Sequence, residues 1–194
     1  MILKRFNDAT FILQNSTWKF FNEIKMIAIK LPVYMVIRYI KGVDIKFNYK
    51  IYGYPKIFRY RKSEIRIGDN FENRNNWDSN PLGINHPTIL CTWSSKAKII
   101  IGNDVGISGG SIVAATKIVI GDGTLIGANN TIIDTDFHPL DTPKRRYATH
   151  GIRSKPIKIG KNVFIGMECI ILKGVEIPDN SVIPAGSVIR KWEK

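Results

Sequence analysis

His138 is the residue of this chain best suited to acid–base chemistry. It precedes Pro139 and is flanked by Asp134, Asp136 and Asp141 in the stretch IDTDFHPLD. An imidazole can take a proton from a hydroxyl group near neutral pH. A nearby carboxylate can hold the ring tautomer and stabilise the imidazolium. The same composition also suits a solvated surface loop, and the residues alone leave both interpretations open.

Metal chemistry and covalent catalysis find little support in the chain. There are three histidines, and none forms the close pair that a His-rich zinc site requires, so no metal is expected. Cys91 and Cys169 stand far apart and lack a CxxC context. We expect Cys169 to be a buried free thiol. Reduced cysteines fit a cytoplasmic protein, and the N-terminus shows no signal peptide pattern.

The candidate residues are embedded in a six-residue aliphatic repeat. A strand alternates every two residues, so a period of six fits one short strand and a corner, and three such sides close a triangular coil. Sandwich strands recur every 8–12 residues with irregular turns and do not produce this spacing. We therefore predict an all-β fold, a parallel β-helix with stacked coils ~4.8 Å apart. The repeat positions are Ile101, Ile107, Val113, Ile120, Ile126, Ile132, Ile159, Ile165, Ile171, Ile177, Ile183 and Ile189.

The repeat stops between Ile132 and Ile159. The intervening segment is polar, charged and rich in proline, and it must project from a corner because the repeat resumes behind it. Long loops inside regular solenoids are usually functional. We therefore expect an inserted loop over residues 134–156, with His138 near its start.

The N-terminal third carries most of the positive charge. Residues 1–62 contain 13 Lys and Arg against 3 Asp and Glu, a net charge of +10, whereas residues 63–194 contain 16 against 13, a net charge of +3. We interpret 1–62 as a basic helical cap and 63–194 as the β-helix. The segment from Ile45 to Arg61 is expected to form strands leading into the first coil. No nucleic-acid-binding motif is present, so no nucleic-acid partner is predicted.

An amphipathic helix is predicted within this cap. Phe20, Ile24, Ile27 and Leu31 share one face at helical spacing, and Pro32 should end or kink the helix. No stretch is long and apolar enough to span a bilayer. Two interpretations stay open: the apolar face docks on the open end of the prism, as a solenoid requires, or the cap also contacts the membrane surface.

The repeat segments resemble a known family. IGNDVG, IGDGTLIG, IGKNVFIG and ILKGVEIPDNSVIPAGSVI resemble the hexapeptide-repeat acyltransferases, in particular the maltose/galactoside O-acetyltransferase-like group and its bacterial polysaccharide O-acetyltransferases. The similarity covers about residues 64–191. It implies that the coil is left-handed, an exception to the usual crossover rule. His138-Pro139 matches the family's His-Pro dipeptide, which implies that His138 is the general base.

The resemblance also implies an activity. It is acetyl-CoA-dependent O-acetylation of a hydroxyl on a bacterial surface polysaccharide, its lipid-linked repeat unit or a precursor sugar, in a homotrimer with sites between subunits. Acetyl-CoA would be the co-substrate. Gly166, Met167, Ala185 and Gly186 match positions along the pantetheine arm, and Arg190 and Lys191 match a polar pair near the nucleotide. Corner geometry alone would also explain the glycines.

Two further residues have open roles. Ser108 stands where the sugar acetyltransferases carry an Asn, so it could bind substrate or fill a tight corner. His86 lies in an NHPT segment similar to one in the polysaccharide-modifying relatives, and either a substrate-side role or a structural turn fits. Of the three possible acid partners, Asp134 and Asp136 are the preferred candidates to orient His138.

Three rival functions remain. An N-acetyltransferase acting on an amino sugar nucleotide would use the same fold, and a non-enzymatic glycan-binding β-helix scaffold would need no catalytic histidine. A metal-dependent hydratase is disfavoured by the shortage of histidines. The expected location is the cytoplasm, with peripheral contact at the inner face of the membrane as an open alternative.

Overall fold

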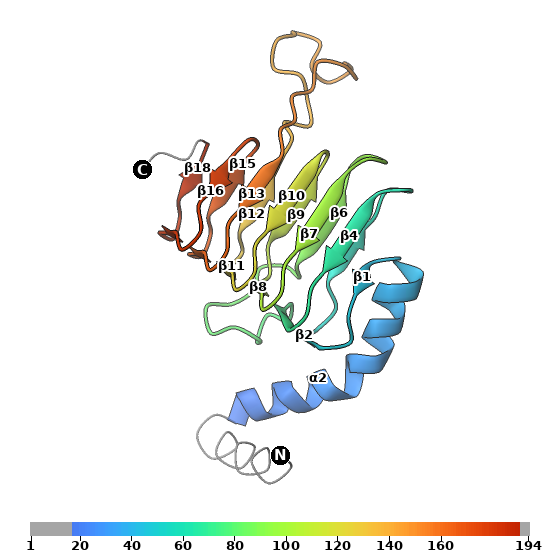
Figure 1. Cartoon of the computed structure of the whole chain (residues 1–194), viewed down its shortest axis with the longest axis vertical. Helices are drawn as coiled ribbons and strands as arrows, with labels where there is room; N and C mark the ends of the chain where they lie inside the picture. Colours follow the sequence, from blue (N-terminus) through green and yellow to red (C-terminus); the bar gives the residue numbers. More distant parts are fainter. Residues whose placement is uncertain (1–16, 191–194) are drawn as a thin grey trace.

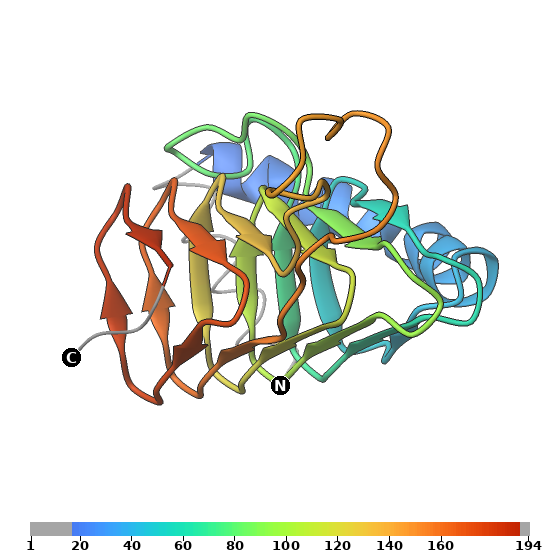
Figure 2. The same cartoon turned by 90° about the horizontal axis from the view of Figure 1, so that it is seen from above.

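The described residues, 17–190, form a three-sided prism of short parallel strands with a helix at one end (Figure 1). Three sheets of six strands make the three sides, and consecutive strands along the chain belong to successive sheets, so each coil contributes one strand to each side (Figure 2). The predicted fold class, an all-β left-handed parallel β-helix with an N-terminal helical segment, is confirmed.

We name the sheets A, B and C in the order in which the chain enters them. Sheet A holds β1 (Asp44–Ile45), β4 (Glu64–Ile67), β7 (Lys98–Ile101), β10 (Lys117–Ile120), β13 (Ile157–Ile159) and β16 (Glu176–Ile177). Sheet B holds β2 (Tyr49–Tyr52), β5 (Phe71–Arg74), β8 (Gly106–Ser108), β11 (Leu125–Ala128), β14 (Phe164–Ile165) and β17 (Val182–Ile183). Sheet C holds β3 (Lys56–Phe58), β6 (Ile89–Thr92), β9 (Ser111–Ala114), β12 (Thr131–Ile133), β15 (Ile170–Leu172) and β18 (Val188–Ile189).

The aliphatic repeat builds the core. Ile101 pairs in register with Ile120, and Ile120 with Ile159, and all three side chains are buried inside the prism. One repeat position was predicted wrongly. Ile112, and not Val113, points inward and pairs with Ile132, because the turn at Gly109 and Gly110 is one residue shorter than the six-residue spacing assumes.

The corners between sheets A and B place a residue in the left-handed region. Asn70, Asp104 and Asn162 have φ of +55°, +56° and +51° there, a conformation that Asn and Asp tolerate better than other side chains. Their side chains also link neighbouring coils, since Asn70 Nδ2 donates to Asp104 Oδ1 over 2.9 Å. The polar corner residues therefore contribute to coil stacking.

The cap differs from its prediction in the face that docks. Pro32 lies inside the helix α2 (Thr17–Met35) and does not end it, and Figure 1 shows that the helical segment bends. A π-helical turn, η1 (Val36–Ile40), follows. The chain buries Met26, Val33 and Ile37, so the predicted face of Phe20, Ile24, Ile27 and Leu31 is not the one that docks on the prism; the last three are exposed.

The β-helix also begins earlier than the charge distribution suggests. Strands β1, β2 and β3 form the first coil, which starts at Asp44, so the boundary between residues 62 and 63 does not separate cap from β-helix. The basic residues of this coil, such as Lys50 and Lys56, point outward from ordinary strands. Net charge therefore does not follow the structural boundary.

The prediction of a buried free thiol at Cys169 is confirmed, and Cys91 is also free and buried. Within residues 17–190, no helix is long and apolar enough to cross a membrane.

Candidate active site

The loop that carries His138 leaves the prism at the corner between sheets C and A, which we call the CA corner. β12 ends at Ile133 and β13 begins at Ile157, and the orange segment between them stands out from the upper edge of the prism in Figure 1. A Thr135–Ser154 bridge closes the base, and Asp136 N donates to Arg153 O over 3.1 Å. The loop is therefore held at its stem by short antiparallel pairing.

His138 lies just beyond this stem and is exposed. Its N–H donates to the carbonyl of Asp136 over 2.7 Å, which makes a tight turn with Phe137 at φ +59°. The Phe137 ring packs edge-on against Trp93 at 5.3 Å between centroids. On the other side, Arg145 Nε donates to the carbonyl of Pro139 over 2.9 Å. These contacts hold the backbone around His138, while its side chain is exposed.

Asp134 does not orient the ring. Its carboxylate is fully buried and accepts bonds from the N–H groups of Ala115, Thr116 and Lys117 and from the Thr116 hydroxyl, at 2.6–2.8 Å. These four hydrogen bonds all join Asp134 to the neighbouring coil at the CA corner. The predicted role beside His138 is therefore replaced by a structural one.

Asp136 and Asp141 are also engaged elsewhere. Lys173 Nζ bonds to Asp136 Oδ1 over 2.5 Å, and Arg153 pairs with Asp141. The second oxygen of Asp136, Oδ2, is buried and has no partner among residues 17–190. Within that range no carboxylate is bonded to the His138 ring, so each of the three aspartates has another partner in place of the imidazole.

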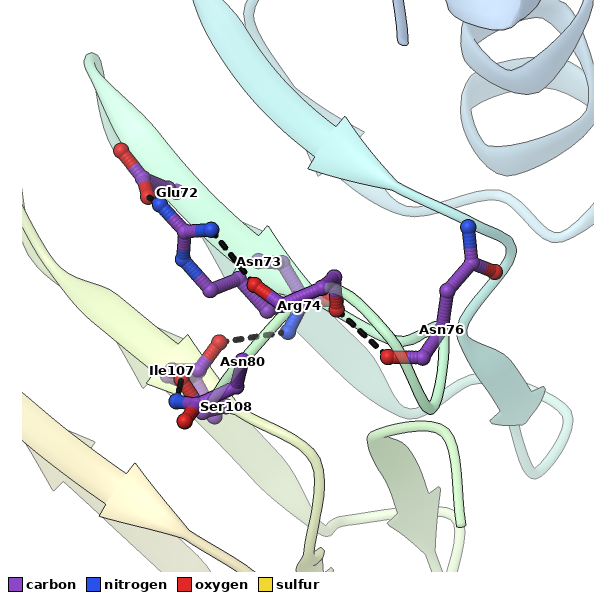
Figure 3. Close-up of polar contacts among 8 residues, drawn as sticks. Glu72, Asn73, Arg74, Asn76, Asn80, Ile107 and Ser108 are labelled. Atoms are coloured by element: carbon purple, nitrogen blue, oxygen red, sulfur yellow. Dashed lines mark hydrogen bonds and ion pairs between the residues drawn. The ribbon is translucent and has the colours of Figure 1, made fainter. Parts of the chain in front are cut away.

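A groove lies on the outer face of sheet B. It has a volume of about 390 Å³ and is lined by residues of β5, β8, β11 and β14, including Arg74, Ser108, Leu125 and Phe164. Figure 3 shows Arg74 lying along this face, where it pairs with Glu72 at 2.6 Å and donates to the carbonyl of Ser79. The groove therefore combines apolar walls with charged and hydroxyl groups.

Ser108 lies at the end of β8, where the chain turns from sheet B to sheet C, a position we call the BC corner. Asn80 Nδ2 donates to Ser108 Oγ over 3.1 Å (Figure 3). Asn80 belongs to the loop of residues 75–88, so this bond ties that loop to the groove. Among residues 17–190, Ser108 Oγ accepts this bond and has no other side-chain hydrogen bond.

His86 lies in the same loop and is half-buried. Its Nδ1 lies 2.9 Å from the carbonyl of Pro87, and the preceding Asn85 N donates to Asn129 Oδ1. A Cβ on Gly109 would lie 2.7 Å from Ile84 and 2.9 Å from the carbonyl of His86. Gly109 is therefore explained by the loop that packs over it, whereas a Cβ on Gly110 would lie 2.3 Å from the carbonyl oxygen of Asn130 in the next coil.

The predicted cofactor residues divide between two corners. Gly166, Met167, Ala185 and Gly186 follow β14 and β17 at the BC corner. Arg190 follows β18 at the CA corner, where it lines a cavity of about 600 Å³ with Arg153, Lys155 and Lys173. Lys191 lies outside the described residues.

The glycines have packing reasons of their own. A Cβ on Gly166 would lie 2.5 Å from Ala185 N in the next coil, so its small size is required for stacking. Gly186 has open space around it but a φ of +73°, which favours glycine. Coil packing and backbone conformation therefore account for these two glycines.

One copy of the chain keeps the two sets of candidates apart. The loop of residues 134–156 and the green loop of residues 75–88 lie at opposite edges of the prism in Figure 1. His138 is therefore at one edge, and Ser108, His86 and Gly166 are at another. Among residues 17–190, no group of three or more His, Cys, Asp or Glu side chains is placed to hold a metal ion.

Comparison with known proteins agrees with the resemblance seen in the repeats. Residues 156–191 match the family described as hexapeptide repeat of succinyl-transferase. Galactoside O-acetyltransferase of Escherichia coli (strain K12) is 43% identical over 81 residues, 42% of this chain and 38% of that protein. Galactoside O-acetyltransferase of Lactococcus lactis subsp. lactis (strain IL1403) is 38% identical over 81 residues, with the same coverage. The match thus spans less than half the length of these relatives.

Solved structures give weaker similarity. A hexapeptide-repeat acetyltransferase of Vibrio cholerae O1 biovar eltor, complexed with acetyl coenzyme A, is 30% identical over 54% of this chain and 50% of its own, with a TM-score of 0.37. The polysialic acid O-acetyltransferase OatWY is 21% identical over 72% of this chain and 77% of its own, with a TM-score of 0.48. The chain therefore carries hexapeptide repeats and has O-acetyltransferases among its relatives.

Proposed function

We propose that this protein is an acetyl-CoA-dependent O-acetyltransferase that modifies a hydroxyl of a bacterial surface polysaccharide, its lipid-linked repeat unit or a precursor sugar. The observation that carries the proposal is His138, exposed on a loop whose stem is anchored to a hexapeptide-repeat β-helix. The identity of part of the chain to galactoside O-acetyltransferase supports the same chemistry.

In this mechanism His138 takes the proton of the acceptor hydroxyl. The oxygen attacks the thioester carbonyl carbon of acetyl-CoA directly, and a backbone N–H stabilises the oxyanion of the tetrahedral intermediate. When the C–S bond breaks, the acetyl group remains on the acceptor oxygen. The CoA thiolate leaves and accepts from the imidazolium the proton that His138 took from the acceptor hydroxyl. No covalent enzyme intermediate is needed.

We infer that the working unit is a homotrimer. One chain separates His138 from Ser108 and Gly166, so a site containing all three needs the CA corner of one copy to face the BC corner of the next. Large apolar side chains on the outer faces of sheets B and C, which a partner subunit would cover, support this arrangement. They are Leu125, Phe164, Ile170, Val182 and Val188.

In such a trimer the acetyl-CoA site would be built from two chains. Met167 and Ala185 at the BC corner would border the pantetheine arm, with Ser108 on the acceptor side. The cavity at the CA corner contains Lys155 and Arg190, which have no ion pair within residues 17–190 and would offer cations to the phosphates of the cofactor. His86 is held by the loop of residues 75–88 and would act only by shaping the acceptor side.

The proposal places the protein in the cytoplasm, where acetyl-CoA is made. Its direct test is an assay of acetyl transfer by the purified full chain. The reaction is measured by the release of free CoA thiol and by the mass of the acceptor. Transfer to saccharides that carry only hydroxyl groups is expected. Transfer confined to amino sugar nucleotides would replace the proposal with N-acetylation, and absence of CoA binding in calorimetry would indicate a glycan-binding scaffold.

A further inference from the structure

The helix α2 carries an apolar stripe that the prism leaves uncovered. We define the α2 stripe as Phe21, Ile24, Ile27, Leu31 and Met35, whose exposures are 57%, 49%, 67%, 60% and 48%. The next turn, η1, adds Tyr39 and Ile40 at 67% and 74%. Scattered apolar side chains on a surface need no explanation, but seven within twenty residues of one helical segment do.

The stripe is a true second face of the helix. At about 100° per residue, the stripe residues fall within roughly 60° of Ile24, while the buried Met26 and Val33 lie about 180° away. Met26 and Val33 pack toward the prism, and α2 contacts β2 through that side. The helix is therefore apolar on two opposite faces, and docking on the prism uses only one of them.

Positive charge is concentrated in the part of the chain that contains this stripe. Residues 17–62 contain 11 Lys and Arg and 2 Asp and Glu, a net charge of +9 (11 − 2), against +3 (16 − 13) for residues 63–194. Lys25 and Lys30 flank the stripe on its two sides at helical spacing. Lys25 Nζ also lies 3.9 Å from Asp78 Oδ2, and Lys30 Nζ lies over the rings of Phe47 and Tyr49, so the helix holds both cations beside the stripe. An apolar stripe bordered by cations on a helix lying against a folded body is the pattern of an interfacial helix.

The charge distribution selects the occupant. A second copy would bring the same positive charge to the contact and would be repelled. A lipid surface with anionic head groups is complementary both to the stripe and to its basic border, with each Lys or Arg near such a surface favourable by about 1 kcal/mol. The helix lacks the uninterrupted apolar length needed to cross a bilayer, so it would lie in the plane of the interface.

We propose that the α2 stripe and η1 dock this protein on an anionic membrane surface, with the stripe inserted at the head-group boundary and the prism standing off it. This docking does not depend on acetyl transfer. If the proposed function also holds, it favours the lipid-linked repeat unit over a soluble precursor sugar as the acceptor, because that acceptor shares the membrane surface.

The test is co-sedimentation of the full chain, residues 1–16 included, with large unilamellar vesicles. Vesicles of phosphatidylcholine with about 30% phosphatidylglycerol are compared with pure phosphatidylcholine vesicles. We expect binding to the anionic vesicles at physiological salt, at least tenfold weaker partitioning onto the neutral ones, and weakening as salt is raised. A chain that stays in the supernatant with anionic vesicles would overturn the proposal.

Paired variants make the test specific to the stripe. Ile27→Glu/Leu31→Glu adds two charges at exposed positions and should fold normally by circular dichroism while partitioning at least tenfold less. The control, Leu140→Glu/Tyr147→Glu, adds the same charge at exposed apolar positions of the loop of residues 134–156, away from α2 (Figure 1), and should bind like the wild type. Equal binding of the two variants would contradict docking through the stripe.

A separate measurement addresses the rival occupant. Sedimentation velocity of the wild type and Ile27→Glu/Leu31→Glu in the absence of vesicles should give the same particle size. A smaller particle for the variant would show that the stripe joins copies of this chain and would overturn lipid docking. Because vesicle binding is read without substrate, its failure is distinct from failure of the proposed acetyl transfer.

Discussion

Lys173 Nζ lies 2.5 Å from Asp136 Oδ1, so the residue after β15 is tied to the stem of the loop that carries His138. Both side chains are mostly buried. The other carboxylate oxygen, Asp136 Oδ2, has no partner within residues 17–190. The Lys173 ammonium group therefore compensates the charge of the Asp136 carboxylate, in the stem of the loop that carries the proposed general base.

Removing the ammonium group should loosen the loop. In Lys173→Met, Asp136 keeps its burial and loses its cation, so we expect the free energy of unfolding to fall by about 1–3 kcal/mol. Amide hydrogen exchange within residues 135–154 should accelerate more than elsewhere. Lys158→Met is the matched control because Lys158 points outward from β13. Equal destabilisation by the two variants would rule out a special role for the pair.

Asp134 offers a test that separates structure from catalysis. Asp134→Asn places an amide group among three backbone N–H donors and a hydroxyl, so we expect unfolding to become easier by about 2–4 kcal/mol. The pH profile of acetyl transfer in the folded fraction should not move. A shifted profile with normal stability would return Asp134 to the role of orienting His138.

His138 carries the proposed chemistry. His138→Ala should lower turnover by about 10²–10⁴-fold, because that is the usual contribution of general-base help. The side chain is exposed, so the melting temperature and the affinity for CoA should stay near wild type. His150→Ala, an exposed histidine in the same loop, serves as the control. Normal turnover in His138→Ala would discard the mechanism.

The sequence predicted the fold because one period encodes it. Ile101, Ile120 and Ile159 are spaced so that only stacked coils bury them all. The same rule placed Val113 inside the prism wrongly, because a six-residue period cannot reveal a corner that is one residue shorter. The helix face was also mistaken. Ile27 and Val33 belong to two different apolar faces of α2, each with helical spacing. Only the packing of α2 on β2 shows that the face of Val33 is the docked one.

The site was harder to predict than the fold. The loop could be predicted because it interrupts the period, and the role of His138 stays a prediction. The hydrogen-bond partners of the aspartates could not be predicted. Asp134 and Asp136 lie two residues apart in a polar stretch, and only the fold shows which of them faces the coil at Ala115. Sequence spacing also could not show that His138 and Ser108 lie at different corners, which makes a second copy part of the site hypothesis.

Stability should depend on pH through Asp122. The N–H of Asn103 donates to its Oδ1 over 2.9 Å and Lys161 lies 3.2 Å from Oδ2, and these contacts lower the pKa of Asp122 below its ordinary 3.8. A lowered pKa in the folded state gives stability that is present above the unfolded value and lost as the pH falls through the folded one. Asp122→Asn should therefore lose less stability than wild type between about pH 6 and pH 3. A carboxyl ¹³C titration of Asp122 measures the shift directly, and an unshifted titration would refute this explanation.

Gly166 and Gly186 separate coil stacking from backbone freedom. In Gly166→Ala the new methyl would lie 2.5 Å from Ala185 N, a backbone atom that cannot move without shifting β17, so unfolding should become easier by more than about 2 kcal/mol. In Gly186→Ala the methyl has open space and only the φ of +73° is strained, so the loss should be about 1 kcal/mol. Chemical denaturation without cofactor measures both. If both variants are as stable as wild type yet bind CoA weakly, the two glycines serve the pantetheine arm and not the packing of the coils.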